Sequence, residues 1–157
     1  MALIPAVDPA LAALVVKDGV ALGGLPEHQR QLALALAWVG LPEVPLTEPE
    51  VNDRLKSLLA RALRCLDTDH VELRRWLVDA GWLARDGYGR RYERVARGDL
   101  PPARTAAAAA VAGLAPDAFT AACRAERAAE RESRRQAWVA RGGPSLPEPS
   151  PPEPSPP

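Results

Sequence analysis

The sequence predicts an α+β protein that is mostly helical. Apolar residues recur at helical spacing in several segments, two short β-prone segments flank a glycine-containing turn, and the chain ends in a proline-rich stretch. With 157 residues, of which 47% are hydrophobic, the chain can bury one core and carry extensions. We expect four parts: a short helix and connecting segment (1–24), a folded domain (25–97), an Ala/Arg-rich helical extension (103–141) and a disordered tail (142–157).

Local signals define the first helices. Asp8-Pro9 predicts the start of a short helix, because Asp caps the free amides and Pro fits the first turn. A longer helix is expected over Leu25–Val39, with Gly40 as its stop. A third helix follows Thr47, whose hydroxyl can accept the amide of Glu50 while the Glu50 side chain reaches back to the amide of Thr47.

The middle of the chain predicts one more helix and a hairpin. A helix from about Asp69 to Ala80 is closed by Gly81, and its apolar residues on two sides predict that it is partly embedded between its neighbours. Trp82–Arg85 and Arg90–Val95 then flank a turn, which is typical of a β-hairpin. Together with a short extended piece at 44–46, the order is helix, strand, helix, helix, strand, strand. That order is typical of a winged-helix domain, with the hairpin as its wing.

The composition changes after Leu100. Ala103–Leu114 is expected to form an alanine-rich helix, and a further helix is expected from about Pro116 to Arg141. Its apolar stripe is thin, so Trp138 is a candidate anchor either on the domain or on a partner protein. The last 14 residues contain eight prolines and predict an extended tail.

Several classes of function are disfavoured by composition. The 20 basic and 20 acidic side chains cancel, which excludes a global basic field. No apolar run approaches the roughly 20 residues of a membrane span, and the two distant cysteines indicate reduced thiols and a cytoplasmic location. His28 and His70 have no partners at ligand spacing, and no paired nucleophile or phosphate loop occurs. We therefore expect no metal, no cofactor and no enzymatic activity.

The hairpin carries the strongest local charge. Residues 85–97 contain five arginines against Asp86 and Glu93, a net charge of +3, with two interleaved tyrosines, Tyr88 and Tyr92, that could lie over a sugar-phosphate backbone. Two further arginines lie on the third helix of the domain. The candidate DNA-binding residues are Arg74, Arg75, Arg85, Arg90, Arg91 and Arg94.

These arginines have a structural interpretation as well. Eighteen of the 20 basic residues are arginine, so an arginine here is a weak functional signal. The hairpin arginines could simply keep an edge strand soluble. On the third helix, Glu72, Arg75 and Asp79 share one strip and could form an ion-pair network that fixes the helix.

Two stretches resemble a known family. Leu46–Asn52 (LTEPEVN) and Asp69–Asp86 (DHVELRRWLVDAGWLARD) resemble the uncharacterised prokaryotic family called domain of unknown function 2087, and the likeness extends over about residues 15–95. The matching positions are Thr47, Glu48, Glu50, Val51, Asn52, Leu73, Arg74, Arg75, Leu77, Val78, Asp79 and Gly81. The chain departs from the family pattern at 27–31, where the family usually has more basic residues.

The resemblance implies a winged-helix-like fold, and some members of the family are called transcriptional regulators. No catalytic residues carry over. We therefore expect a non-enzymatic, DNA-associated regulator that binds duplex DNA. The alternative is a protein-interaction module that keeps the scaffold without binding nucleic acid and recruits its partner through the C-terminal helix. The oligomeric state stays open.

Overall fold

The protein is described by a computed structural model, which covers residues 7–143 and 152–155. It divides into two compact units, Met1–Ala125 and Glu126–Pro157. The described elements, in order, are α1 (Pro9–Val15), η1 (Leu22–Gly24), α2 (Glu27–Gly40), β1 (Leu46–Thr47), α3 (Glu48–Ala60), α4 (His70–Asp79), β2 (Leu83–Arg85), β3 (Arg91–Arg94), η2 (Arg97–Asp99), η3 (Pro102–Arg104), α5 (Thr105–Ala110) and α6 (Pro116–Ala140).

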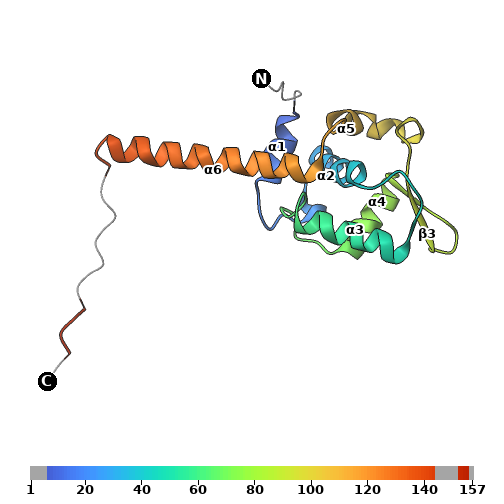
Figure 1. Ribbon diagram of the computed structural model, residues 1–157, viewed down its shortest axis with the longest axis horizontal. Coiled ribbons are helices and arrows are strands. Elements are labelled where there is room, and N and C mark those ends of the chain that lie inside the picture. The colour runs from blue at the N-terminus through green and yellow to red at the C-terminus, as the bar shows by residue number, and fades with distance from the viewer. Residues whose placement is uncertain (1–6, 144–151, 156–157) are drawn as a thin grey trace. The chain divides into compact units, whose positions relative to one another are not determined.

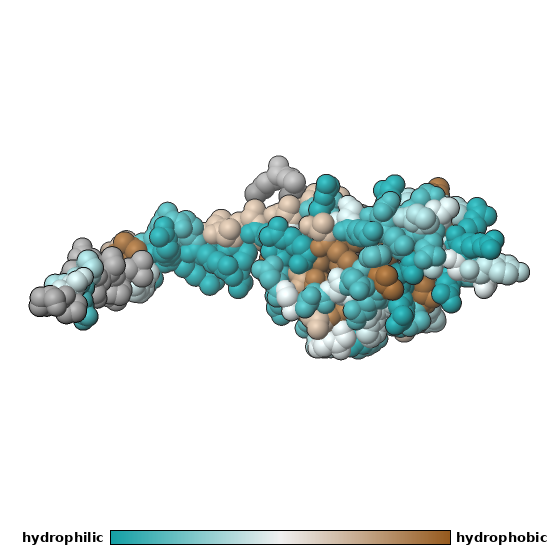
Figure 2. Space-filling model, turned by 90° about the horizontal axis from the view of Figure 1, so that it is seen from below, coloured by the Kyte–Doolittle hydropathy of each residue, from teal (hydrophilic) through white to brown (hydrophobic). Residues whose placement is uncertain are grey.

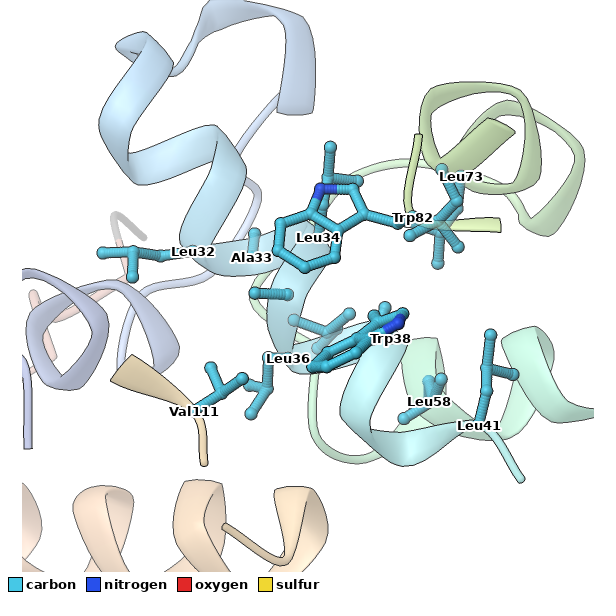
Figure 3. Packing of buried hydrophobic residues seen from close by; sticks show 14 of the residues in the cluster. Leu32, Ala33, Leu34, Leu36, Trp38, Leu41, Leu58, Leu73, Trp82 and Val111 are labelled. Atoms are coloured by element: carbon cyan, nitrogen blue, oxygen red, sulfur yellow. The ribbon is translucent and has the colours of Figure 1, made fainter. Parts of the chain in front are cut away.

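The predicted α+β class and the predominance of helix are confirmed. Helix α2 lies at the centre of the first unit, between α5 and α3, and also contacts α1 and α4 (Figure 1). All its residues from 31 to 38 are buried, as expected for a helix that is covered on every side. Its Trp38 packs against Trp82 with ring centroids 5.3 Å apart, in the middle of the apolar cluster (Figure 3).

The sheet has three antiparallel strands in the order β1-β3-β2. In β3, Tyr92 pairs with Leu46 of β1 and with Arg85 of β2. Since side chains alternate along a strand, Leu83, Arg85 and Tyr92 share the face directed toward the helices. The outer face carries Ala84, Arg91 and Glu93.

At three helix starts, the cap residues accept the backbone hydrogen bonds that the sequence predicts. Asp8 accepts the amide of Ala10 (2.8 Å), Asp69 accepts the amide of Glu72 (2.8 Å), and Thr47 accepts the amide of Glu50 (3.3 Å). The second half of the Thr47 capping box differs from the prediction: the Thr47 hydroxyl donates to the Glu50 carboxylate at 2.8 Å. The hydroxyl is therefore both acceptor and donor at this helix start.

Other boundaries and exposures differ from the sequence-based expectation. Helix α2 begins at Glu27, two residues later than predicted, and ends at Gly40, where a Cβ would come within 2.9 Å of Leu58, so this glycine also allows close helix packing. The alanine-rich helix α5 ends at Ala110 and not at Leu114, with Gly113 in a left-handed turn at φ +75°. On α4 only one side is buried, and Val71 is exposed because no element covers it.

The core of the first unit extends beyond residues 25–97 on both sides. Before this range, α1 and the following turn bury Leu11, Leu14, Val15 and Leu22. After it, the buried side chains are Leu100, Ala107, Ala108, Val111 and Thr120. The expected disordered tail, 142–157, lies mostly outside the described residues; of the part that is described, 152–155 is exposed and has no regular secondary structure.

The surface of the first unit is mostly polar. The face seen in Figure 2 is dominated by hydrophilic side chains, with hydrophobic ones visible only between them. Among the described helices, none is long and apolar enough to cross a membrane.

Candidate nucleic-acid interface

Helix α4 and the hairpin form the two walls of a surface groove. On α4, Leu73 and Leu77 are fully buried, so the residues on the opposite side of the helix face outward. On the hairpin, Tyr92 and Arg85 lie side by side in paired strands and face α4. The groove between the two walls has a volume of about 300 Å³ and is lined by Val71, Arg74, Arg75, Val78, Asp79, Arg85 and Tyr92.

A second depression lies on the other side of the hairpin. It has a volume of about 290 Å³ and is lined by Pro45, Ala84, Arg85, Asp86, Arg91, Tyr92 and Glu93. Arg85 borders both depressions.

Arg74 is held inside the domain by contacts to its neighbours. Its side chain is only 17% exposed, donates to Asn52 Oδ1 at 2.5 Å and to Glu48 Oε1 at 3.3 Å, and lies 5.2 Å from the Tyr92 ring centroid. Glu48, Asn52 and Arg74 belong to the two sequence stretches that carry the family resemblance. The structure therefore brings both stretches together around one guanidinium. The sequence contained no signal for this pairing, because the partners lie on another helix.

Arg94 is also held by contacts within the domain. It donates to the carbonyl oxygens of Leu41 (3.0 Å) and Val39 (3.4 Å) at the end of α2, and its guanidinium stacks 4.3 Å from the Trp38 ring centroid. Its side chain is 14% exposed and pairs with Glu43. A cation that caps a helix C-terminus compensates both the free carbonyls and the helix dipole.

The two tyrosines of the hairpin differ in exposure. Tyr92 is 2% exposed, so the expectation that it lies over a sugar-phosphate backbone is wrong. Tyr88, at the tip of the hairpin, is 86% exposed.

Replacing Arg94 with alanine should destabilise the fold without altering contacts to nucleic acid. Loss of its bonds to the end of α2 should lower the free energy of unfolding by about 2 kcal/mol. Urea unfolding measures this change. The salt dependence of DNA binding by the folded variant should equal that of the wild type; normal stability with a reduced salt dependence would instead place Arg94 on the interface.

Two other arginines repeat the role of Arg94. Arg104 donates to the carbonyl oxygen of Ala80 at the end of α4 (2.9 Å), and Arg124 donates to that of Val15 at the end of α1 (3.0 Å). Three helix C-termini are thus closed by arginines from distant segments. A count of arginines along the chain therefore overstates the charge that is free to meet a partner.

Four of the six candidate arginines remain exposed. Their guanidinium groups have no hydrogen-bond or ion-pair partner among the described residues. They are Arg75 on α4, Arg85 on β2, Arg90 in the hairpin turn and Arg91 on β3. The predicted ion pairing of Arg75 with Glu72 and Asp79 is not formed, and Glu72 instead accepts the Thr68 hydroxyl at 2.7 Å.

Acidic side chains limit which part of α4 can meet a polyanion. Asp69 and Glu72 are exposed at its first turn, and Asp79 lines the groove. Carboxylates repel phosphates, so the N-terminal end of α4 is a poor surface for DNA. On the helix–hairpin face, the exposed candidate arginines are Arg75 and those of the hairpin.

The hairpin turn is ordered by a carboxylate. Asp86 Oδ1 accepts the backbone amides of Arg90 (2.8 Å) and Arg91 (3.3 Å), and the Asp86 carbonyl accepts the amide of Gly89 at 3.1 Å. These amide bonds, that of Arg90 foremost, hold the pKa of Asp86 below its usual range. The turn thus fixes the backbone from which Arg90 and Arg91 project.

The order of this turn should depend on pH. Because the folded-state pKa of Asp86 is depressed, its stabilising bonds are present at neutral pH and are lost as the pH falls below the usual carboxylate range. The amide resonances of Arg90 and Arg91 should then shift toward those of a disordered turn. Asp86→Asn keeps an acceptor but cannot titrate, so an identical shift in this variant would exclude Asp86 as the cause.

Other candidate chemistry has little support in the described residues. Burial, as the main cause, raises the pKa of Cys65 to about 11, so the buried thiol stays protonated at neutral pH. Within residues 7–143 and 152–155, no group of three or more His, Cys, Asp or Glu could hold a metal ion.

The fold and the groove together define a small α+β domain with a basic helix–hairpin face. Residues 25–94 match the model of a family described as an uncharacterized protein conserved in bacteria, DUF2087. This range runs from just before α2 to the end of β3, so the match confirms the family resemblance over this domain, which is less than half of the chain. No curated protein and no solved structure matches the chain.

Proposed function

We propose that the domain at residues 25–94 is a non-enzymatic, winged-helix-like module that binds duplex DNA and acts as a DNA-associated regulator. Its order of elements, α2-β1-α3-α4-β2-β3 with a hairpin after α4, supports the winged-helix assignment. The observation that carries the DNA proposal is that the candidate arginines of the domain fall into two groups. Those on the helix–hairpin face are exposed and unpaired, whereas Arg74 and Arg94 are held by the protein itself.

The contacts proposed are to phosphates. Arg75 and Arg85 line the groove from opposite walls, and Arg90 and Arg91 continue the positive charge along the hairpin. Readout of bases by the first turn of α4 is disfavoured because Asp69 and Glu72 are exposed there. The module should therefore bind DNA with little sequence preference by itself.

Salt dependence tests this proposal. Four phosphate contacts on duplex DNA predict a slope of about −3.6 for the logarithm of affinity against the logarithm of salt concentration. Between about 50 and about 200 mM salt the affinity should then fall on the order of a hundredfold. Fluorescence anisotropy of the full chain with a labelled random duplex measures it. The absence of binding at the lower salt concentration would remove the DNA proposal.

A protein-interaction module is the second candidate. It is favoured by two large hydrophobic side chains on the second unit, Trp138 and Val139, which are 49% and 62% exposed. Partner binding through this helix should be lost in Trp138→Ala. Partner binding that survives this substitution would exclude the helix as the anchor.

A further inference from the structure

Tyr88 is the most exposed of the large hydrophobic side chains in the described structure. It is 86% exposed at the tip of the hairpin. Its neighbours Gly87 and Gly89 have no side chains, and a Cβ at either position would meet nothing within 4 Å. The ring therefore projects into open solvent with space on both sides.

The tip is nevertheless held by a hydrogen-bonded frame. The amide of Asp86 donates to the carbonyl oxygen of Arg91 at 3.0 Å, which closes the end of the hairpin, and Gly89 closes the turn onto Asp86. Gly89 takes φ +66°, a conformation that glycine adopts without steric cost. A tyrosine presented in this way loses little conformational entropy on binding, because only two side-chain angles have to be fixed.

The charges around the ring select a type of partner. Arg85, Arg90 and Arg91 are exposed on the same hairpin and suit a phosphate backbone. A flat ring with open faces beside such cations matches the way proteins hold unpaired bases, in which cations follow the backbone and aromatic rings stack on bases. Inside a paired duplex each base is covered on both faces by its neighbours, whereas a single-stranded stretch has bases with open faces.

We propose that Tyr88 stacks on an unpaired nucleobase, so that the hairpin prefers DNA in which a duplex continues into a single strand. This inference rests on the proposed DNA binding and adds the class of DNA. The arginines supply contacts to phosphates, and Tyr88 supplies the contact that distinguishes paired from unpaired bases.

Anisotropy with three matched probes tests the proposal on the full chain. The probes are a blunt duplex, the same duplex with a single-stranded extension, and the same duplex with an abasic extension that keeps the phosphates. The wild type should bind the extended duplex about tenfold more tightly than the other two, since stacking contributes roughly 1–3 kcal/mol per base. Tyr88→Phe should keep this preference, and Tyr88→Ala should lose it without changing its affinity for the blunt duplex.

The outcomes separate the two proposals. Equal binding of all three probes by the wild type, or a preference that survives in Tyr88→Ala, overturns the stacking role and leaves the DNA proposal intact. A wild type that binds no probe overturns both. Because Tyr88 is 86% exposed, both variants should retain the wild-type melting temperature, which checks that they are folded.

Discussion

Replacing Arg75, Arg85, Arg90 and Arg91 together with serine is expected to abolish measurable binding to duplex DNA. The salt-dependence slope should fall from about −3.6 toward zero, because each lost phosphate contact removes about 0.9. All four side chains are exposed, so the free energy of unfolding should change little. Anisotropy at several salt concentrations, together with urea unfolding, measures both effects.

The chain offers a matched control for this variant. Arg54 on α3 and Arg64 after it are also exposed and have no side-chain partner among the described residues. Replacing them with serine removes two positive charges outside the groove, so it can be compared with the pair Arg90→Ser and Arg91→Ser. The control pair should retain near wild-type affinity. Equal losses in the two pairs would mean that only the overall charge matters.

Trp82→Ala is expected to have the largest effect on stability. Trp82 is fully buried, packs against Trp38 and donates from Nε1 to Gln31 Oε1 at 2.8 Å. Removing a buried tryptophan costs about 4 kcal/mol, and the Gln31 carbonyl loses its partner as well. Thermal unfolding should therefore shift down by on the order of 10 °C.

Trp138 provides a comparison for the stability effect of Trp82→Ala. Trp138 is half exposed on the second unit, where the end of α6 closes with the amide of Gly143 donating to the carbonyl oxygen of Trp138. Trp138→Ala should change the unfolding free energy of the first unit by less than about 0.5 kcal/mol. Similar losses in Trp82→Ala and Trp138→Ala would contradict the assignment of Trp82 to the centre of the core.

Local features of the fold were predictable because their causes are local. Capping by Asp8, Thr47 and Asp69 needs only residues two or three positions ahead, and the hairpin follows from two short β-prone segments around a turn. The bounds of the folded unit were not predictable in this way. Short helix α1 and alanine-rich α5 have weak periodic patterns, and they join the core only because α2 needs cover on every side.

Whether an individual arginine is exposed or bound within the domain depends on the tertiary structure. Arg94 reaches a carbonyl 53 positions away, and Arg124 reaches one 109 positions away. An arginine has a long side chain and five donors, so a sequence cannot tell whether it faces solvent or a distant helix end. Two of the six candidates, Arg74 and Arg94, therefore make contacts within the domain that the sequence did not predict. The two tyrosines also differ for a reason beyond composition: strand alternation buries Tyr92, and the turn exposes Tyr88.

Chemical-shift mapping tests the central claim most directly. In two-dimensional ¹H–¹⁵N spectra of the full chain titrated with a short duplex, the perturbed amides should cluster at residues 71–79 and 83–94, with the largest shifts near Arg75, Arg85, Arg90 and Arg91. Perturbations concentrated in α3, α5 or α6, or no perturbation at low salt, would contradict the assignment of the helix–hairpin face as the nucleic-acid interface.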